Sequence, residues 1–365
     1  MSAGFAAADV SVSGDARMGV VSSNDVMTFS NRIRIKFSGS GTTDGGLSFG
    51  GSFRANEAAL AESAGTKGSA FISGAFGKIT MGSVDSGDSA SVGQLASVGF
   101  AGLGSGNSIS YAADAGGDDG LPGTLADAGG ARVLYTYSAG ALTLNASTAQ
   151  MTDGGATAYG IGGSYAAGAL TVGLGYGVVD GATTTVKYYD AAILSPSIAA
   201  GNFDASADAS VTDLSLSASY VMGTTTIKAI YQQKSIEVTS AAVTASGSTV
   251  ATYVHAHDAV DLAADATSMG LSVVQKMDAL TLTAYGINTT LDADADLSAD
   301  NPTVSRYGIG FGYDLGGGAS VAGGWATVDA LVPTAGSVTT AGDIQTYTLT
   351  SVSADQWDLG LNFSF

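Results

Sequence analysis

Five cationic side chains are concentrated near the start of the sequence, and their spacing places them on one surface. Arg17, Arg32, Arg34, Lys36 and Arg54 fall in three short segments in which they alternate with apolar residues. In an extended strand successive side chains point to opposite faces, so the five cations would share a polar face. If the three strands are neighbours, this face becomes one basic patch that attracts anionic groups. The alternative is a solvated polar face with charges placed by chance.

A long segment between residues 84 and 130 carries the opposite charge. Its acids are Asp85, Asp88, Asp114, Asp118, Asp119 and Asp127. The segment lacks sustained periodicity, and loops beyond ~12–15 residues are usually functional or disordered. If this loop folds toward the basic patch, some of the carboxylates would face the cations across a narrow opening, where charge and diameter set selectivity. An exposed acidic loop is the alternative.

Acids and histidines elsewhere give only weak site patterns. Asp292, Asp294 and Asp296 are spaced like the start of a calcium loop, but the Gly and Glu that complete an EF-hand are missing. His255 and His257 provide too few ligands for a zinc site. Hydrolytic chemistry needs a nucleophile with a base, usually His, and none of the predicted strands contains one. We therefore predict no cofactor and no enzyme, with loose binding of Ca²⁺ by acidic loops as the open alternative.

Strands with one apolar and one polar face must position the cations. Apolar residues largely alternate with polar ones in segments 10–20, 29–39, 47–56 and 357–365, which is the period of a β-strand. The chain is 45% hydrophobic, yet no apolar run approaches the ~18 residues of a membrane helix. A chain that stops on the aromatic Phe365 is typical of the last strand of an outer-membrane barrel.

A repeated hairpin unit organises the chain from residue 132 onward. Each unit has a strand ending in Tyr, a tight turn and a strand starting near Leu-Thr, as in Tyr137–Leu144 and Tyr165–Val172. Longer polar connections separate the units, at about 152–157, 181–210, 237–266, 291–303 and 331–353. Short turns at one end and long loops at the other are typical of an outer-membrane barrel. The sequence therefore predicts an all-β fold, a transmembrane antiparallel β-barrel of about 16 strands, wide enough to hold water.

Composition limits the classes of function and partner. The net charge of −19 leaves no basic surplus for binding nucleic acid. Cysteine is absent, so disulfides and thiolate metal sites are not available. Residues 1–8 have no basic or long apolar region and are interpreted as the remnant of a leader. Residues 9–365 are expected to form a single barrel, with 84–130 as its third, constricting loop folded into the lumen.

Several motifs in order give a family resemblance. They are Ser13–Gly19, Gly39–Leu47, Gly74–Gly82, Tyr135–Gly140 and Gly312–Ser320. From about Asp9 to Phe365 the sequence resembles the general diffusion porins of alphaproteobacteria, the Rhodobacter type. The resemblance implies a homotrimer of sixteen-stranded barrels, with Arg17, Arg32, Arg34 and Arg54 on the basic wall of each pore. It also raises the question of calcium at Asp118 and Asp119, because some family members bind this ion near the constriction.

Passive diffusion of small hydrophilic solutes and ions through an outer membrane is the function that these observations predict. The acidic loops and the overall charge favour cations while the basic wall opposes them, so a weak cation preference is expected. The expected surroundings are outer-membrane lipid and lipopolysaccharide of a Gram-negative bacterium. A solute-specific channel is the nearest alternative. A secreted β-rich adhesin and an outer-membrane enzyme are alternatives from other classes.

Overall fold

Nearly all of the described chain is extended. The computed structural model describes residues 9–23, 25–58, 61–103, 106–114, 132–150, 157–189, 202–240, 243–246, 254–257, 260–293, 302–334 and 348–365. The first strands are β1 (Asp9–Ser23), β2 (Val26–Thr42), β3 (Ser48–Ala58), β4 (Ala61–Gly74), β5 (Gly77–Gly82), β6 (Arg132–Ala139), β7 (Leu142–Gln150), β8 (Thr157–Ala167) and β9 (Leu170–Tyr189). The others are β10 (Asn202–Met222), β11 (Thr225–Ser240), β12 (Val243–Ser246), β13 (Val254–His257), β14 (Val260–Met277), β15 (Leu280–Ala293), β16 (Thr303–Gly316), β17 (Ala319–Thr334) and β18 (Thr348–Ser364).

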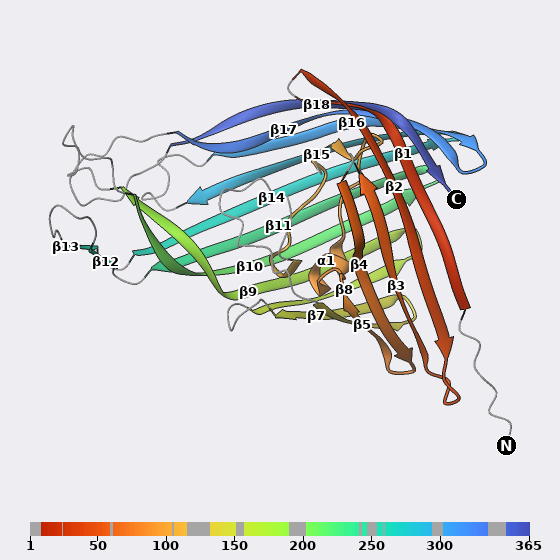
Figure 1. Ribbon diagram of the computed structural model, residues 1–365, viewed down its shortest axis with the longest axis horizontal. Helices are drawn as coiled ribbons and strands as arrows, with labels where there is room; N and C mark the ends of the chain where they lie inside the picture. Colours follow the sequence, from red (N-terminus) through yellow and green to blue (C-terminus); the bar gives the residue numbers. More distant parts are fainter. Residues whose placement is uncertain are drawn as a thin grey trace.

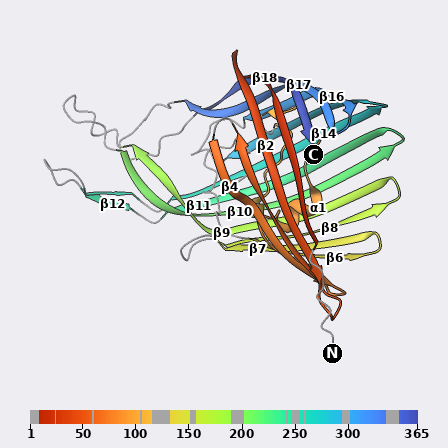
Figure 2. The ribbon, with the colours of Figure 1, turned by 45° about the vertical axis from the view of Figure 1, so that its right-hand side comes forward.

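The strands close into one antiparallel barrel. Each barrel strand pairs with its neighbours in the chain, and β11 pairs with β14 because β12 and β13 form a small sheet of their own. The sixteen-stranded ring is closed by pairing of β1 with β18, in a seam that runs from Asp15 opposite Ser364 to Ser23 opposite Gln356. Figures 1 and 2 show the long tilted strands from two directions. The predicted fold class is confirmed.

Two-residue turns connect the hairpins at one end of the barrel. The turns after β6, β8 and β10 begin at Gly140, Gly168 and Gly223, whose φ angles are 61°, 64° and 61°. Glycine adopts this left-handed conformation without the steric cost that a Cβ imposes, which explains the repeated Gly of the hairpin units. Positions with φ above zero suit the primed turns, whose twist matches that of paired strands.

The outer face of the barrel carries the large apolar side chains. Phe29 is 91% exposed, and Ile309 and Leu174 are more than half exposed, as expected for residues that meet lipid. The buried apolar residues lie inside the ring instead, where a loop packs on the wall. Among the described residues, the only α-helix is α1 (Gly87–Val92), and no helix there is long and apolar enough to cross a membrane.

Strands extend farther into the long-loop end than the sequence indicates. The connection expected at 181–210 is shorter, because β9 continues to Tyr189 and β10 begins at Asn202. The one expected at 331–353 is likewise reduced by β17 and β18. These stretches consist mainly of Thr, Ser, Ala and Asp without an apolar face. Backbone pairing does not require an apolar face, so alternation underestimates strands that continue beyond the bilayer.

Candidate functional site

The segment after β5 folds into the barrel and lies along its inner wall. Helix α1 is placed inside the ring in Figure 1, and it contacts β7, β8, β9 and β10. We call residues 83–103 and 106–114 the inner loop. It leaves β5, follows the wall as far as β18 and returns to β6, as the contacts below establish. The predicted folding of the third loop into the lumen is therefore observed for these residues, whereas residues 115–130 lie outside the described ones.

Glycines on β8 and β9 make room for α1. A Cβ added to Gly175 would lie 2.8 Å from the Cα of Asp88, and one added to Gly162 would lie 2.5 Å from Ser91 Oγ. Such contacts are too short for any side chain other than hydrogen at the first position, because the obstacle is backbone. Both glycines face the lumen. The helix can approach the wall this closely only because the wall has no side chains there.

An apolar cluster fastens the middle of the inner loop to the wall. The buried loop side chains are Val92, Leu95, Val98, Leu103, Ile109 and Tyr111, and they pack with Ile230, Tyr285, Ile287 and Ala326 of the barrel. Burial of apolar area stabilises the docked loop by roughly 25 cal/mol per Å². Part of the inner face of the barrel therefore carries an apolar cluster, which the sequence did not predict.

The tip of the inner loop is tied to the closing seam. The backbone N–H of Ala101 donates to Asp358 Oδ2 on β18 at 2.7 Å, and Arg17 Nη1 on β1 donates to the Ala101 carbonyl at 3.3 Å. The Phe100 ring lies beneath the Arg17 guanidinium, 5.8 Å from its carbon to the ring centre. The ring also lies over Gly360, where a Cβ would be 2.8 Å away. The tip therefore has a fixed position against β1 and β18.

Side-chain hydrogen bonds hold the two arms of the inner loop together. Gln94 on the outgoing arm donates to the Ile109 carbonyl at 2.7 Å and accepts from the Ile109 N–H at 2.6 Å. Tyr111 Oη donates to the Gly93 carbonyl at 2.5 Å. Asn107 donates to the Leu95 carbonyl at 2.6 Å. The loop is therefore a rigid hairpin-like layer on the wall.

Two buried carboxyl groups meet where α1 contacts β9 and β10. Asp88 is fully buried, and Asp213 on β10 is 1% exposed. Asp88 Oδ2 and Asp213 Oδ1 each lie 2.5 Å from the position of a Cβ on Gly177, so they are at most about 5 Å apart by simple geometry. Asp213 accepts from the Ala112 N–H at 2.8 Å and from Ser215 Oγ at 2.8 Å. Neither oxygen of Asp88 has a hydrogen-bond partner of good geometry.

Burial and the neighbouring carboxylate raise the pKa of Asp88 to about 7. Loss of hydration is the larger cause and the charge of Asp213 the second, while the Ser86 hydroxyl and backbone N–H groups nearby offset part of the shift. Asp213 accepts three hydrogen bonds, from Ala112, Ser215 and Gln232, whereas Asp88 accepts none of good geometry. Asp88 is therefore the member of the pair that holds a proton near neutral pH.

A second carboxyl group anchors the base of the inner loop. Asp114 Oδ1 lies 2.9 Å from Arg132 Nη1 on β6 and accepts from the Ser86 N–H at 3.1 Å. Burial raises the pKa of Asp114, while the charge of Arg132 acts in the opposite direction. The pair joins the start of the loop to its end and to the strand that follows.

The five cations predicted to form one surface do share a face of the sheet. Arg17 is opposite Arg32 in the β1–β2 register, and Lys36 is opposite Arg54 in the β2–β3 register, while Arg34 lies two residues from both Arg32 and Lys36. Side chains directly opposite each other in an antiparallel pair project to the same face. The contact of Arg17 with the inner loop identifies this face as the lumenal one. We call these five residues the basic wall.

Asp15 lies among the cations of the basic wall, although the sequence analysis assigned it no role. Its Oδ1 lies 2.7 Å from Arg32 Nη2, and it stands opposite Arg34 in the register. Asp15 is two residues before Arg17 in the same strand, and this spacing could have placed it on the same face as the cations. With Asp358 near Arg17 as a second carboxylate, the five cations still outnumber the local acids.

The acids of the inner loop do not all face the basic wall. Asp85 is exposed, but Asp88 lies against β8–β10 on the other side of the ring, and Asp114 pairs with β6. Some of the loop carboxylates were expected to face the cations, and Asp88 and Asp114 are not among those that do. A segment without periodicity does not indicate which way its side chains point, and these two acids serve as anchors. Asp118, Asp119 and Asp127 lie outside the described residues.

The predicted metal positions are mostly outside the part of the chain with described side chains. Asp292 is exposed near the end of β15, whereas Asp294 and Asp296 are not described. His255 and His257 are described as backbone of β13 only. Within the described residues, no group of three acidic or histidine side chains is close enough together to hold a metal ion.

Comparison with known proteins agrees with this architecture. Residues 1–350 match the family model described as Gram-negative porin. The porin of Rhodobacter capsulatus is 36% identical over 314 residues, which cover 84% of this chain and 90% of that protein. A solved porin structure is 31% identical and covers 98% of this chain and 100% of its own, with a TM-score of 0.65. The trimer form of OmpT, an outer-membrane protein of Vibrio cholerae, shares only the fold at 16% identity, with a TM-score of 0.70 over 98% of this chain and 100% of its own.

These matches confirm three predictions made from the sequence. The Rhodobacter-type resemblance is confirmed by the R. capsulatus relative, and the outer-membrane location follows from the family. The family and the fold indicate a channel and not an enzyme. The chain belongs to the Gram-negative porin family and is an outer-membrane porin channel.

Proposed function

We propose that this porin allows passive diffusion of small hydrophilic solutes and ions through a water-filled, charged constriction. One observation carries the proposal: the inner loop is fixed along the wall of a closed sixteen-stranded barrel, and the basic wall lines β1, β2 and β3, where the tip of the loop contacts Arg17. A barrel of this size holds an aqueous channel unless something fills it. A loop held flat on the wall narrows such a channel without filling it.

Charge selectivity follows from two opposed contributions. The net charge of −19 and the exposed Asp85 favour cations, while the basic wall favours anions at the narrow part. Asp88 and Asp114 of the inner loop turn toward the barrel wall, so they contribute little to the attraction of cations in the lumen. We propose a cation preference that is weak for this reason. Reversal potentials in a salt gradient across a planar bilayer measure it, and a clear anion preference would refute it.

A homotrimer in outer-membrane lipid is the proposed assembly. Very exposed apolar residues on β1 and β2, with Val10 at 76% and Phe29 at 91%, need lipid or another subunit to cover them. The trimer form of the Vibrio cholerae relative supports three subunits. Lipopolysaccharide is proposed as the outer-leaflet contact. Loose Ca²⁺ binding by the acidic segments near Asp292 and at Asp118 and Asp119 is proposed with it, and chelation of Ca²⁺ should then lower thermal stability.

The experiment for channel function is conductance in planar bilayers. Purified protein should insert in events of three open pores, with conductance that scales with salt concentration. A folded protein that forms no pore would end the proposal. The solute-specific alternative has less support, because Phe100 and Tyr111, two aromatics that could have formed a ladder for solutes, are buried at 6% and 3% exposure. Flux that saturates at low solute concentration would favour that alternative.

A further inference from the structure

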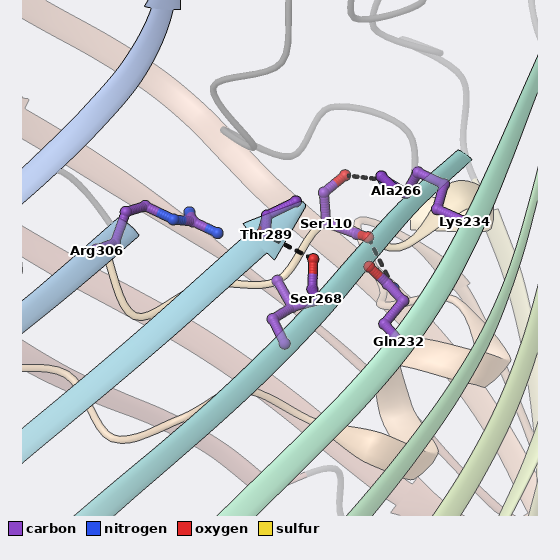
Figure 3. Close-up of a pocket in the computed structure, with 8 residues that line it drawn as sticks. Ser110, Gln232, Lys234, Ala266, Ser268, Thr289 and Arg306 are labelled. Carbon is purple, nitrogen blue, oxygen red and sulfur yellow. Dashed lines mark hydrogen bonds between the residues drawn. The ribbon is translucent and has the colours of Figure 1, made fainter. Parts of the chain in front are cut away.

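A polar cavity lies between the returning arm of the inner loop and strands β11, β14, β15 and β16. It contains about 270 Å³ of empty space, including the part open to solvent. Figure 3 shows Arg306 at one side and Lys234 at the other, with Ser268 and Thr289 between them. These residues come from four consecutive strands of the wall. The cavity is separate from the basic wall, which is built on β1, β2 and β3.

Hydrogen bonds hold the lining of the cavity in place. Lys234 Nζ donates to Ser110 Oγ at 3.0 Å, and Gln232 Nε2 donates to the Ser110 carbonyl at 2.9 Å. The hydroxyl groups of Ser268 and Thr289 are 2.8 Å apart and share one hydrogen bond. Each hydroxyl has both a donor and acceptor capacity and can turn its hydrogen toward a ligand. The cavity therefore has a prepared polar floor with a cation at either end.

Two of the described residues that line the cavity are cations. Lys234 and Arg306 are each 6% exposed, and none of the described residues that line the cavity is acidic. Asp213 stands opposite Lys234 in the β10–β11 register, but its oxygens accept from Ala112, Ser215 and Gln232. Buried cations are stabilised by anionic partners, and charge-assisted hydrogen bonds are the strong ones. Lys234 and Arg306 have other interactions within the protein, so an anion here would be an additional partner.

We propose that this cavity binds a small oxyanion, the carboxylate or phosphate group of a solute, between Lys234 and Arg306. The guanidinium and ammonium groups supply the charge, and whichever hydroxyl of Ser268 and Thr289 accepts their mutual hydrogen bond supplies one further donor. The inference deepens the proposed channel function, on which it rests, by naming a class of solute that pauses beside the constriction. Such a site raises the local concentration of anions on the side of the lumen away from the basic wall.

Calorimetric titration of the purified full-length protein in detergent tests the proposal without requiring ion conduction. Inorganic phosphate and acetate serve as the two probes at neutral pH. The double variant K234Q/R306Q should weaken binding at least tenfold, since two charge-assisted contacts are lost. The single variant T289V should weaken it less and preserve both charges. The matched control K276Q removes a cation from the exposed end of β14 and should leave binding unchanged.

The outcomes separate this site from the basic wall and from the channel itself. Binding of both probes supports a general oxyanion site, and binding of phosphate alone supports a site for tetrahedral anions. Wild-type protein that binds neither probe overturns the proposal. Binding that survives K234Q/R306Q but disappears in R34Q/R54Q also overturns it, because the anion then belongs to the basic wall. Normal conductance together with no anion binding would leave the channel function standing, whereas an absence of conductance would not affect the calorimetric result.

Discussion

Replacement of Asp88 by Asn should remove a pH dependence from the docking of the inner loop. The ordinary pKa of an aspartate is 3.8, and burial beside Asp213 raises the pKa of Asp88 to about 7. The difference corresponds to roughly 4 kcal/mol of added cost for the charged form when the loop is docked. Asn keeps the shape of the side chain and has no charge to bury.

The direction of the effect follows from which state binds the proton. The docked loop holds the proton on Asp88 up to about pH 7, whereas a released loop loses it near pH 3.8. The stabilisation is therefore complete below pH 3.8 and is lost as the pH rises through about 7. The pKa of Asp114 is also raised by burial, so Asp114 likewise stabilises the docked loop more at low pH than at high pH. The charge of Arg132 lowers the pKa of Asp114 and makes this contribution smaller. Two further charged groups face the loop from β11: Lys228, which donates to the Val92 carbonyl at 2.6 Å, and Lys234, which donates to Ser110 Oγ at 3.0 Å.

Hydrogen exchange of the α1 amides is the assay. The Gly93 N–H, which donates to the Ser89 carbonyl at 2.7 Å, reports the docked helix. Its protection, corrected for the intrinsic effect of pH, should fall by up to about a thousandfold between pH 4 and pH 8 in the wild type. Protection in D88N should be nearly constant. D85N removes an exposed carboxylate of the same loop and should retain the wild-type response. Equal protection at both pH values in the wild type would show that Asp88 is not a buried proton carrier.

The remaining predictions concern the wall, the glycines and the loop tip. Charge reversal at Arg54 should shift the reversal potential toward cations more than reversal at Lys276, and equal shifts would place the constriction elsewhere. Replacement of Gly175 by Ala should displace α1 and change single-channel conductance, because a Cβ meets loop backbone at 2.8 Å, whereas Ala at Gly312, with nothing within 4 Å, should conduct as the wild type does. Asn at Asp358 weakens a charge-assisted hydrogen bond to the loop tip and should increase open-channel noise, and an unchanged trace would mean that the tip does not depend on that bond.

Alternation was sufficient to predict the barrel and the basic wall. Each residue of a lipid-facing strand has only two directions, so the positions of Arg32 and Arg34 follow from the apolar residues between them. The lengths of the strands at the long-loop end were underestimated, because the polar side chains there do not alternate with apolar ones.

The inner loop could not be predicted to the same depth. Its backbone has no fixed period, so nothing in the spacing of its residues indicated that Asp88 turns to the wall. Two signals were nevertheless present. Val92, Leu95 and Val98 recur every third residue in an otherwise polar stretch, and β8 and β9 carry glycines on one face, including Gly162 and Gly175. Together these patterns indicate an apolar loop segment that packs on a part of the barrel wall without side chains. Which part of the loop contacts which strands depends on the three-dimensional fold, and residue spacing does not specify it.

The seam between β1 and β18 sets an order on assembly. The two strands that complete the ring, β1 and β18, come from opposite ends of the chain. The other strand pairs can therefore form before these two strands join and close the barrel. Until the last strand arrives, β1 presents an unpaired backbone edge, which is costly in lipid. The loop tip is tied to Asp358 on that same late strand. The pore therefore acquires its final width only when the cylinder is sealed, and a chain shortened before β18 would have neither a finished tube nor a positioned constriction.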